Sequence, residues 1–156
     1  TIALIDCKFR KGLEETGMGY QLEIEVLGYA SRKGLWTKSF CTSPDEAIYM
    51  ANSGVDNIIV HFGNSSGGTI GSTSVMEREE AVARAAAICD VVCEKYPDVI
   101  ITCHGGGIET PEDFTAFLES EPRLDGYVGG SSAERFPVEE SVPKATQGFK
   151  NVKLKK

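Results

Sequence analysis

The sequence has few positive charges and no long apolar run. It contains 16 Lys and Arg against 23 Asp and Glu, which gives a net charge of −7 at pH 7. A surface of this sign repels phosphate backbones and anionic headgroups, so we expect neither nucleic-acid nor membrane binding. No apolar stretch approaches the roughly 20 residues that span a bilayer, and no signal peptide is visible. The expected compartment is therefore the cytoplasm.

Metal-ligand spacing is also lacking. The five cysteines are an odd number and are scattered along the chain, and no cluster has the spacing of a zinc site. Cys89 and Cys93 lie four residues apart within a predicted helix, so we interpret them as buried core thiols rather than ligands. Cysteine chemistry therefore gives no candidate site.

The chain alternates predicted strands and helices, which is typical of a parallel sheet covered by helices. With 156 residues and 41% hydrophobic content, it has the size of a single domain, residues 1–156. Five βα units are expected, with a polar loop after the first strand. A short helix after residue 131 is expected to stop at Pro137, and a last helix to start near Ser141. The expected strands are residues 1–6, 35–41, 55–62, 99–104 and 126–129.

Two of the expected helices have a recognisable sequence pattern, one at its N-terminus and one along an apolar face. Ser43-Pro44-Asp45-Glu46 combines an N-cap, a proline in the first turn and a glutamate placed for a capping box. The helix expected over 20–33 has an apolar side formed by Leu22, Val26, Tyr29 and Ala30.

Glycines follow the last two strands directly. His104 precedes Gly105 and Gly106, and Gly130 precedes Ser131 and Ser132. Glycine allows a close backbone approach, and the helix that follows offers unpaired N–H groups to an anion. Two adjacent junctions of this kind resemble the phosphate cradle of TIM barrels, although tight βα turns explain the same glycines.

Both histidines end predicted strands. His104 and His61 are candidate general acids or bases near neutral pH, or they bond a neighbouring loop. Arg135 either pairs with a bound anion or with a nearby surface glutamate.

Two architectures accommodate five βα units. One is a self-contained, flavodoxin-like five-stranded sheet, which the length favours. The other is a part of an eight-stranded TIM barrel, which the paired glycine junctions favour.

Several motifs together resemble the phosphoenolpyruvate hydrolase-like TIM-barrel family, over essentially the whole chain. A related domain forms the C-terminal part of the plant Tm-1 antiviral resistance protein. The most specific motif is Leu-Glu-Glu-Thr-Gly-Met-Gly-Tyr, which we call the signature segment, residues 13–20. The other motifs are Ile5-Asp6, Phe9-Arg10, His61-x-Gly63, Gly68-x-Ile70-Gly71, Cys103-His104-Gly105-Gly106 and Gly130-Ser131-Ser132-x-Glu134-Arg135-x-Pro137.

The resemblance implies that the chain forms the C-terminal five βα units of a barrel, strands 4–8. It implies an enzyme of the hydrolase or lyase type acting on a small phosphorylated or carboxylated metabolite; the alternative is a non-catalytic small-molecule-binding or signalling module. Asp6 and Glu15 join the histidines as catalytic candidates, and a divalent metal such as Mg²⁺ is a possible cofactor. The open strand edges predict self-association or a complementing N-terminal half-barrel.

Overall fold

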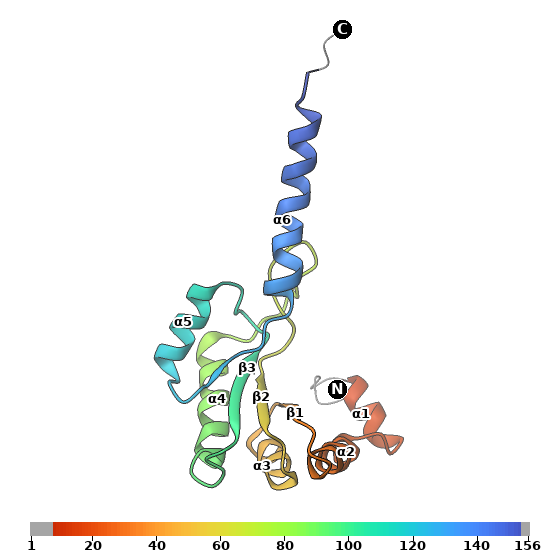
Figure 1. The fold of residues 1–156 in the computed structure, drawn as a ribbon, viewed down its shortest axis with the longest axis vertical. Helices are drawn as coiled ribbons and strands as arrows, with labels where there is room; N and C mark the ends of the chain where they lie inside the picture. The colour runs from red at the N-terminus through yellow and green to blue at the C-terminus, as the bar shows by residue number, and fades with distance from the viewer. Residues whose placement is uncertain (1–7, 154–156) are drawn as a thin grey trace.

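The computed structural model describes residues 8–153 as six helices around four short parallel strands (Figure 1). The predicted strand over 1–6, which contains Asp6, lies outside the described residues. The elements are α1 (Lys8–Glu15), α2 (Tyr20–Arg32), β1 (Lys38–Cys41), α3 (Pro44–Ser53), β2 (Asn57–His61), α4 (Arg78–Val92), β3 (Ile100–His104), α5 (Pro111–Ser120), β4 (Gly126–Tyr127) and α6 (Ser131–Lys150).

The strand order decides between the two architectures. The sheet runs β1-β2-β3-β4, and every pair is parallel. A flavodoxin-like sheet has the order 2-1-3-4-5, in which the second and third strands are not neighbours. Here the second and third predicted strands are β1 and β2, and they pair directly, with Phe40 opposite Ile59. Sequential order is that of a barrel, so the flavodoxin-like alternative is wrong and the fold is part of a TIM barrel.

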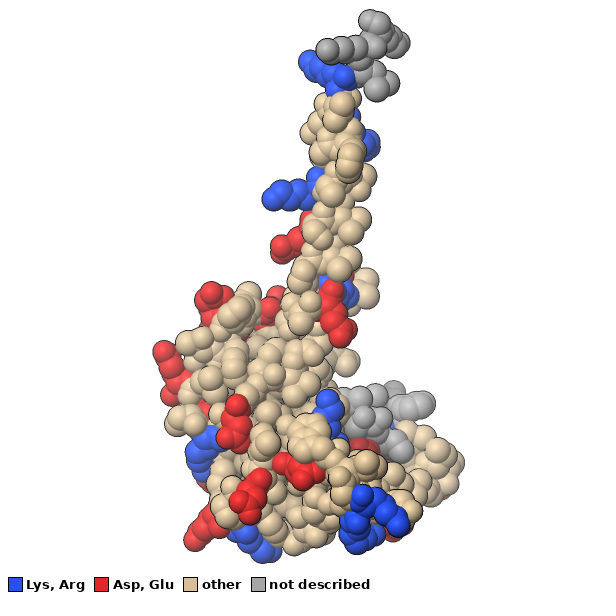
Figure 2. All heavy atoms as spheres, viewed as in Figure 1, with Lys and Arg blue, Asp and Glu red and all other residues tan. Residues whose placement is uncertain are grey.

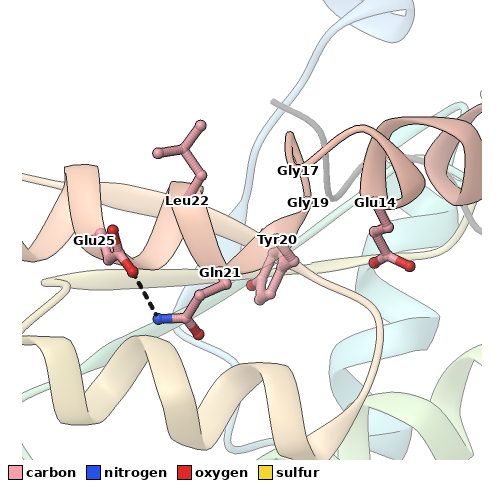
Figure 3. A pocket seen from close by; sticks show the side chains of 7 residues that line it. All are labelled: Glu14, Gly17, Gly19, Tyr20, Gln21, Leu22 and Glu25. Atoms are coloured by element: carbon pink, nitrogen blue, oxygen red, sulfur yellow. Dashed lines mark hydrogen bonds between the residues drawn. The ribbon is translucent and has the colours of Figure 1, made fainter.

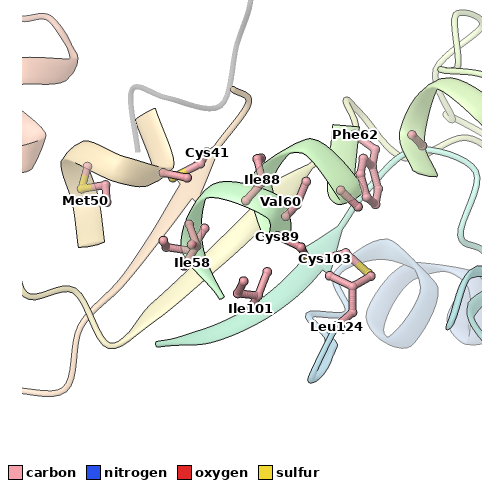
Figure 4. Close-up of a cluster of buried hydrophobic side chains, with 14 of the residues drawn as sticks. Cys41, Met50, Ile58, Val60, Phe62, Ile88, Cys89, Ile101, Cys103 and Leu124 are labelled. Carbon is pink, nitrogen blue, oxygen red and sulfur yellow. The ribbon is translucent and has the colours of Figure 1, made fainter. Parts of the chain in front are cut away.

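The two faces of the sheet have different roles. Ile58, Val60, Ile101 and Cys103 are buried in the main core, together with side chains from α3 and α4 such as Met50 and Ile88 (Figure 4). Residues at the alternate positions, including His61 and His104, point to the opposite face because side chains alternate along a strand. In a closed barrel the opposite face is the interior.

Local capping signals position α3 and α5 after their strands. Ser43 accepts the Glu46 amide at 3.3 Å, and Thr110 forms a complete capping box with Asp113. The expected capping box at α3 is wrong in one respect. The Glu46 carboxylate accepts the backbone amide of Thr42 at 2.7 Å and pairs with Arg10 on α1. The Glu46 carboxylate is therefore bonded to Thr42 and Arg10 and does not complete a capping box with Ser43.

The expected apolar side of α2 faces the wrong way. Leu22, Val26 and Tyr29 are exposed by 43%, 57% and 60%. The side that packs on the core contains Ile24 and Leu27, with Tyr20 and Gly28 buried beside them. Both stripes are apolar at helical spacing, so the periodicity alone did not distinguish them.

Two further expectations at the chain ends are wrong. In place of the polar loop expected after the strand over 1–6, residues 8–15 form α1, and a turn follows Glu15. Neither Pro137 nor Pro143 interrupts α6, which runs from Ser131 to Lys150 and contains both. Each proline removes one helical hydrogen bond, to the carbonyls of Ala133 and Glu139. Ala133 is exposed and Glu139 is half-buried, so water can replace the lost N–H partners.

Helix α6 projects from the body, with its lysines toward the outer end (Figures 1 and 2). It has no buried residue. No helix in the described part of the chain is long and apolar enough to cross a membrane.

Candidate active site

A cavity of about 610 Å³ lies beyond the carboxyl ends of β2 and β3. Three elements contribute to it: the strand ends, the long loop over 63–72, and the first turn of α6. This is the end of the sheet at which TIM barrels place their sites. The lining residues are His61, Gly63, Asn64, Ser65, Ile70, Ser72, His104, Gly130, Ser131, Glu134 and Arg135.

His61 is held neutral, with one defined tautomer. Its Nδ1 accepts the backbone N–H of Gly63 at 3.1 Å, so the ring proton is on Nε2. Burial, the neighbouring His104 and the Arg84 guanidinium lower the pKa of His61 from 6.5 to about 4. Arg84 also donates to the His61 carbonyl at 2.9 Å. His61 therefore offers an Nε2–H donor and is a poor base at neutral pH.

His104 has the opposite tautomer. Its Nδ1 lies 2.6 Å from the carbonyl oxygen of Val128, which only accepts, so Nδ1 carries the proton. In the neutral ring, Nε2 is then an acceptor. The His104 ring lies 5.4 Å from that of His61, and the Phe40 ring contacts both edge-on. The two rings thus present one acceptor and one donor side by side.

The two glycines after β3 allow the tight turn that follows this strand. Gly105 and Gly106 have φ values of +80° and +62°, and the Gly106 amide donates to the Gly63 carbonyl at 3.2 Å. A Cβ on Gly105 would lie 2.2 Å from the Gly63 oxygen. Neither glycine lines the cavity, and their role is to hold the two strand-end loops together.

The start of α6 reaches the cavity only in part. Gly130 and Ser131 line it, but the Ser132 hydroxyl lies 3.0 Å from Tyr127 Oη, and Ser132 lines two other depressions. No side chain caps the helix. The amides of Ala133 and Glu134 donate to the Gly130 carbonyl, while those of the two serines have no partner among the described residues. Such free amides suit an anion.

Arg135 holds the long loop in place. Its guanidinium pairs with Glu139 at 2.7 Å and donates to the Gly67 carbonyl at 3.1 Å. The Glu139 carboxylate accepts the Thr69 amide at 2.7 Å, and Arg135 together with this amide lowers the pKa of Glu139. Two partners were predicted for Arg135, a bound anion or a surface glutamate. The structure shows the second, because Arg135 is bonded to Glu139.

The signature segment lies apart from this cavity. Glu15 is exposed at the end of α1, and Glu14 bonds to Arg10 and lines a separate depression of about 440 Å³ with Tyr20 (Figure 3). The structure therefore brings His61, His104, Gly130, Ser131 and Arg135 together, but not Glu15.

The sequence interpretation did not identify the loop residues of the site. Asn64, Ser65, Ile70 and Ser72 line the cavity, as does Glu134. The available signal was the length of the loop, since a structureless connection of this length is usually functional. The backbone of Gly63 and Val128 sets both tautomers, and no side-chain pattern reveals that.

The divalent metal named as a cofactor stays a prediction. No group of three His, Cys, Asp or Glu residues within the described range is placed to hold an ion.

The sequence profile of the phosphoenolpyruvate hydrolase-like family matches residues 1–152. The chain belongs to this family. It is 42% identical over 154 residues to the ToMV resistance protein Tm-1(GCR237) of Solanum lycopersicum, and 32% identical over 152 residues to the putative transcriptional regulatory protein y4pA of Sinorhizobium fredii. These matches cover 99% and 97% of the chain but only 20% and 25% of the relatives.

A solved structure supports the fold. The chain resembles the N-acetylmannosamine-6-phosphate 2-epimerase from Clostridium perfringens with a TM-score of 0.52. The match covers 82% of this chain and 48% of the epimerase at 18% identity, so it bears on the fold alone.

Proposed function

We propose that the cavity binds a small phosphorylated or carboxylated metabolite and catalyses proton transfer on it, as part of a phosphoenolpyruvate hydrolase-like TIM-barrel enzyme. The observation that carries the proposal is the pair of histidines on neighbouring strand ends, one a donor and one an acceptor. Family membership supports the reaction class of a hydrolase or lyase.

Each residue has a distinct role in this proposal. His104 Nε2 accepts a proton as the general base, and the Val128 carbonyl keeps its ring oriented. His61 donates a hydrogen bond from Nε2 to an anionic oxygen of the ligand. The free amide of Ser131, which lines the cavity, binds the anionic group of the ligand.

The first test is ligand-induced stabilisation. Inorganic phosphate, phosphoenolpyruvate and pyruvate are added separately at increasing concentration, and the melting temperature is measured. A ligand at about 100 times its Kd stabilises the folded state by about 2.7 kcal/mol. No shift with any of the three anions would remove the proposal.

A non-catalytic binding or signalling module is the second candidate, because the curated relatives are named for resistance and regulation rather than for a reaction. His104→Ala separates the two. An enzyme loses turnover of phosphoenolpyruvate while its anion-induced stabilisation persists, whereas a binding module has no turnover in the wild type. Lys95→Ala, an exposed change distant from the cavity, is the control.

We also propose that the protein works in the cytoplasm as an oligomer or with a complementing half-barrel. The support is the incomplete sheet, in which four strands are described and a barrel has eight.

A further inference from the structure

The opposite tautomers of the two histidines restrict which hydrogen-bonding groups a ligand must carry. This inference rests on the proposed function and concerns the substrate class of the same cavity. The Gly63 amide can only donate, so His61 Nδ1 accepts and its Nε2 carries a proton. The Val128 carbonyl can only accept, so His104 Nδ1 carries a proton and its neutral ring leaves Nε2 as an acceptor. The backbone therefore fixes both ring edges before any ligand arrives.

We propose that the cavity selects a 2-hydroxycarboxylate, with the hydroxyl donating to His104 Nε2 and the carboxylate accepting from His61 Nε2–H. The two groups are on adjacent carbons, and the rings that receive them lie 5.4 Å apart between centroids. A 2-oxo acid in its ionised form offers only acceptors, and leaves His104 Nε2 without a donor.

The rest of the cavity agrees with a ligand that carries both a donor and an acceptor. Glu134 also lines the cavity, and its carboxylate is a second acceptor with a negative charge. Arg135 does not offset it freely, because its guanidinium is already bonded to Glu139 and to the Gly67 carbonyl. Phe40 contacts both imidazoles and gives them an apolar neighbour. An unmatched polar group there is costly.

The tautomers are measurable directly. The chain has only two histidines, so a two-bond ¹H–¹⁵N spectrum of the histidine-labelled full chain shows two ring patterns. Recorded at pH 8, above the ordinary range of histidine pKa values, it should show one Nε2–H ring and one Nδ1–H ring. His61→Gln and His104→Gln assign them. Two rings of the same tautomer, or the reverse assignment, would overturn the inference.

Ligand selectivity is measured with three matched three-carbon acids. Lactate, pyruvate and propionate are titrated separately, and the histidine signals report binding. We expect lactate to bind at least about tenfold tighter than the other two, which corresponds to one hydrogen bond to an otherwise unpaired acceptor.

Variants separate recognition of the hydroxyl from recognition of the carboxylate. His104→Phe should abolish the preference for lactate over propionate, and His61→Phe should weaken all three acids to a similar extent. Lys95→Ala should bind like the wild type.

The outcomes distinguish this inference from the proposed function. Equal affinity for lactate and propionate overturns the inference, and if phosphate or phosphoenolpyruvate still stabilises the protein the proposed function stands. No binding of any acid or phosphate removes both.

Discussion

His61 makes the stability of this protein depend on pH in a window set by its burial. The side chain is 4% exposed, and its pKa is lowered from 6.5 to about 4. In the unfolded chain the same imidazole takes up a proton near pH 6.5, while the folded form resists it down to about pH 4. Between these values the unfolded state binds more protons, so the free energy of unfolding rises with pH. Stability is therefore lost as the solution is acidified through this window.

The magnitude follows from the two pKa values. Acidifying from pH 7 to pH 5 should cost roughly 2 kcal/mol of unfolding free energy through His61 alone. His61→Gln removes the titrating group, so the variant should not lose this free energy on acidification. The stability difference between wild type and variant should therefore be smaller at pH 5 than at pH 7 by this amount. The Gln side chain can still accept the Gly63 amide, which keeps the loop contact.

Urea unfolding at pH 7 and at pH 5 measures this difference directly. Lowered carboxyl pKa values, as at Asp113 and Glu121, also destabilise the fold in acid, but they affect wild type and variant alike. Asn64→Ala, in the same cavity and without a titrating group, is the matched control and should follow the wild type at both pH values. If His61→Gln loses as much stability between the two pH values as the wild type does, the neutral buried histidine is refuted.

Three substitutions and one measurement of size test other parts of the structure. Ile58→Ala, in the fully buried core, should cost about 2–5 kcal/mol in urea unfolding with its slope unchanged; a loss below 1 kcal/mol would contradict the core assignment. Glu46→Gln should cost about 1–3 kcal/mol, since the Arg10 partner keeps its charge, and a neutral result would make that contact incidental. Glu139→Ala should accelerate hydrogen exchange at the Thr69 amide, whereas unchanged protection would mean that the loop is held elsewhere. Sedimentation of the chain should show species larger than a monomer, because β1 and β4 have open edges among the described strands; a stable monomer would oppose this.

The sequence predicted the core strands and their order of connection well. A continuous run such as Ile58-Ile59-Val60 has one stable location, inside a parallel sheet covered on both faces. The cap at Ser43 is equally local, because a hydroxyl three residues before a free amide has little else to bind. What remained open was the architecture, since barrel and open sheet share these local signals. The resemblance to the family favoured the barrel, and the pairing of β1 with β2 confirms it.

The wrong expectations depended on contacts between distant segments. Leu22 and Ile24 belong to two apolar stripes on the same helix, and only packing on α3 shows which stripe is buried. Pro137 stops most helices, but α6 continues past it, and Arg135 there is bonded to Glu139 one turn on. The histidine tautomers could not be predicted from the sequence either, because backbone groups of Gly63 and Val128 set them.

The signature segment and the histidines share one rim of the barrel but not one pocket. Arg10 bonds to Glu46 in the first turn of α3, which places α1 beside the carboxyl end of β1. The cavity with His61 and His104 lies beyond the next strands, β2 and β3. Loops that follow neighbouring strands gather at the same end of a barrel, so each carries its own part of the surface there. The motif in the signature segment is therefore separate from the cavity at which we propose that the ligand binds.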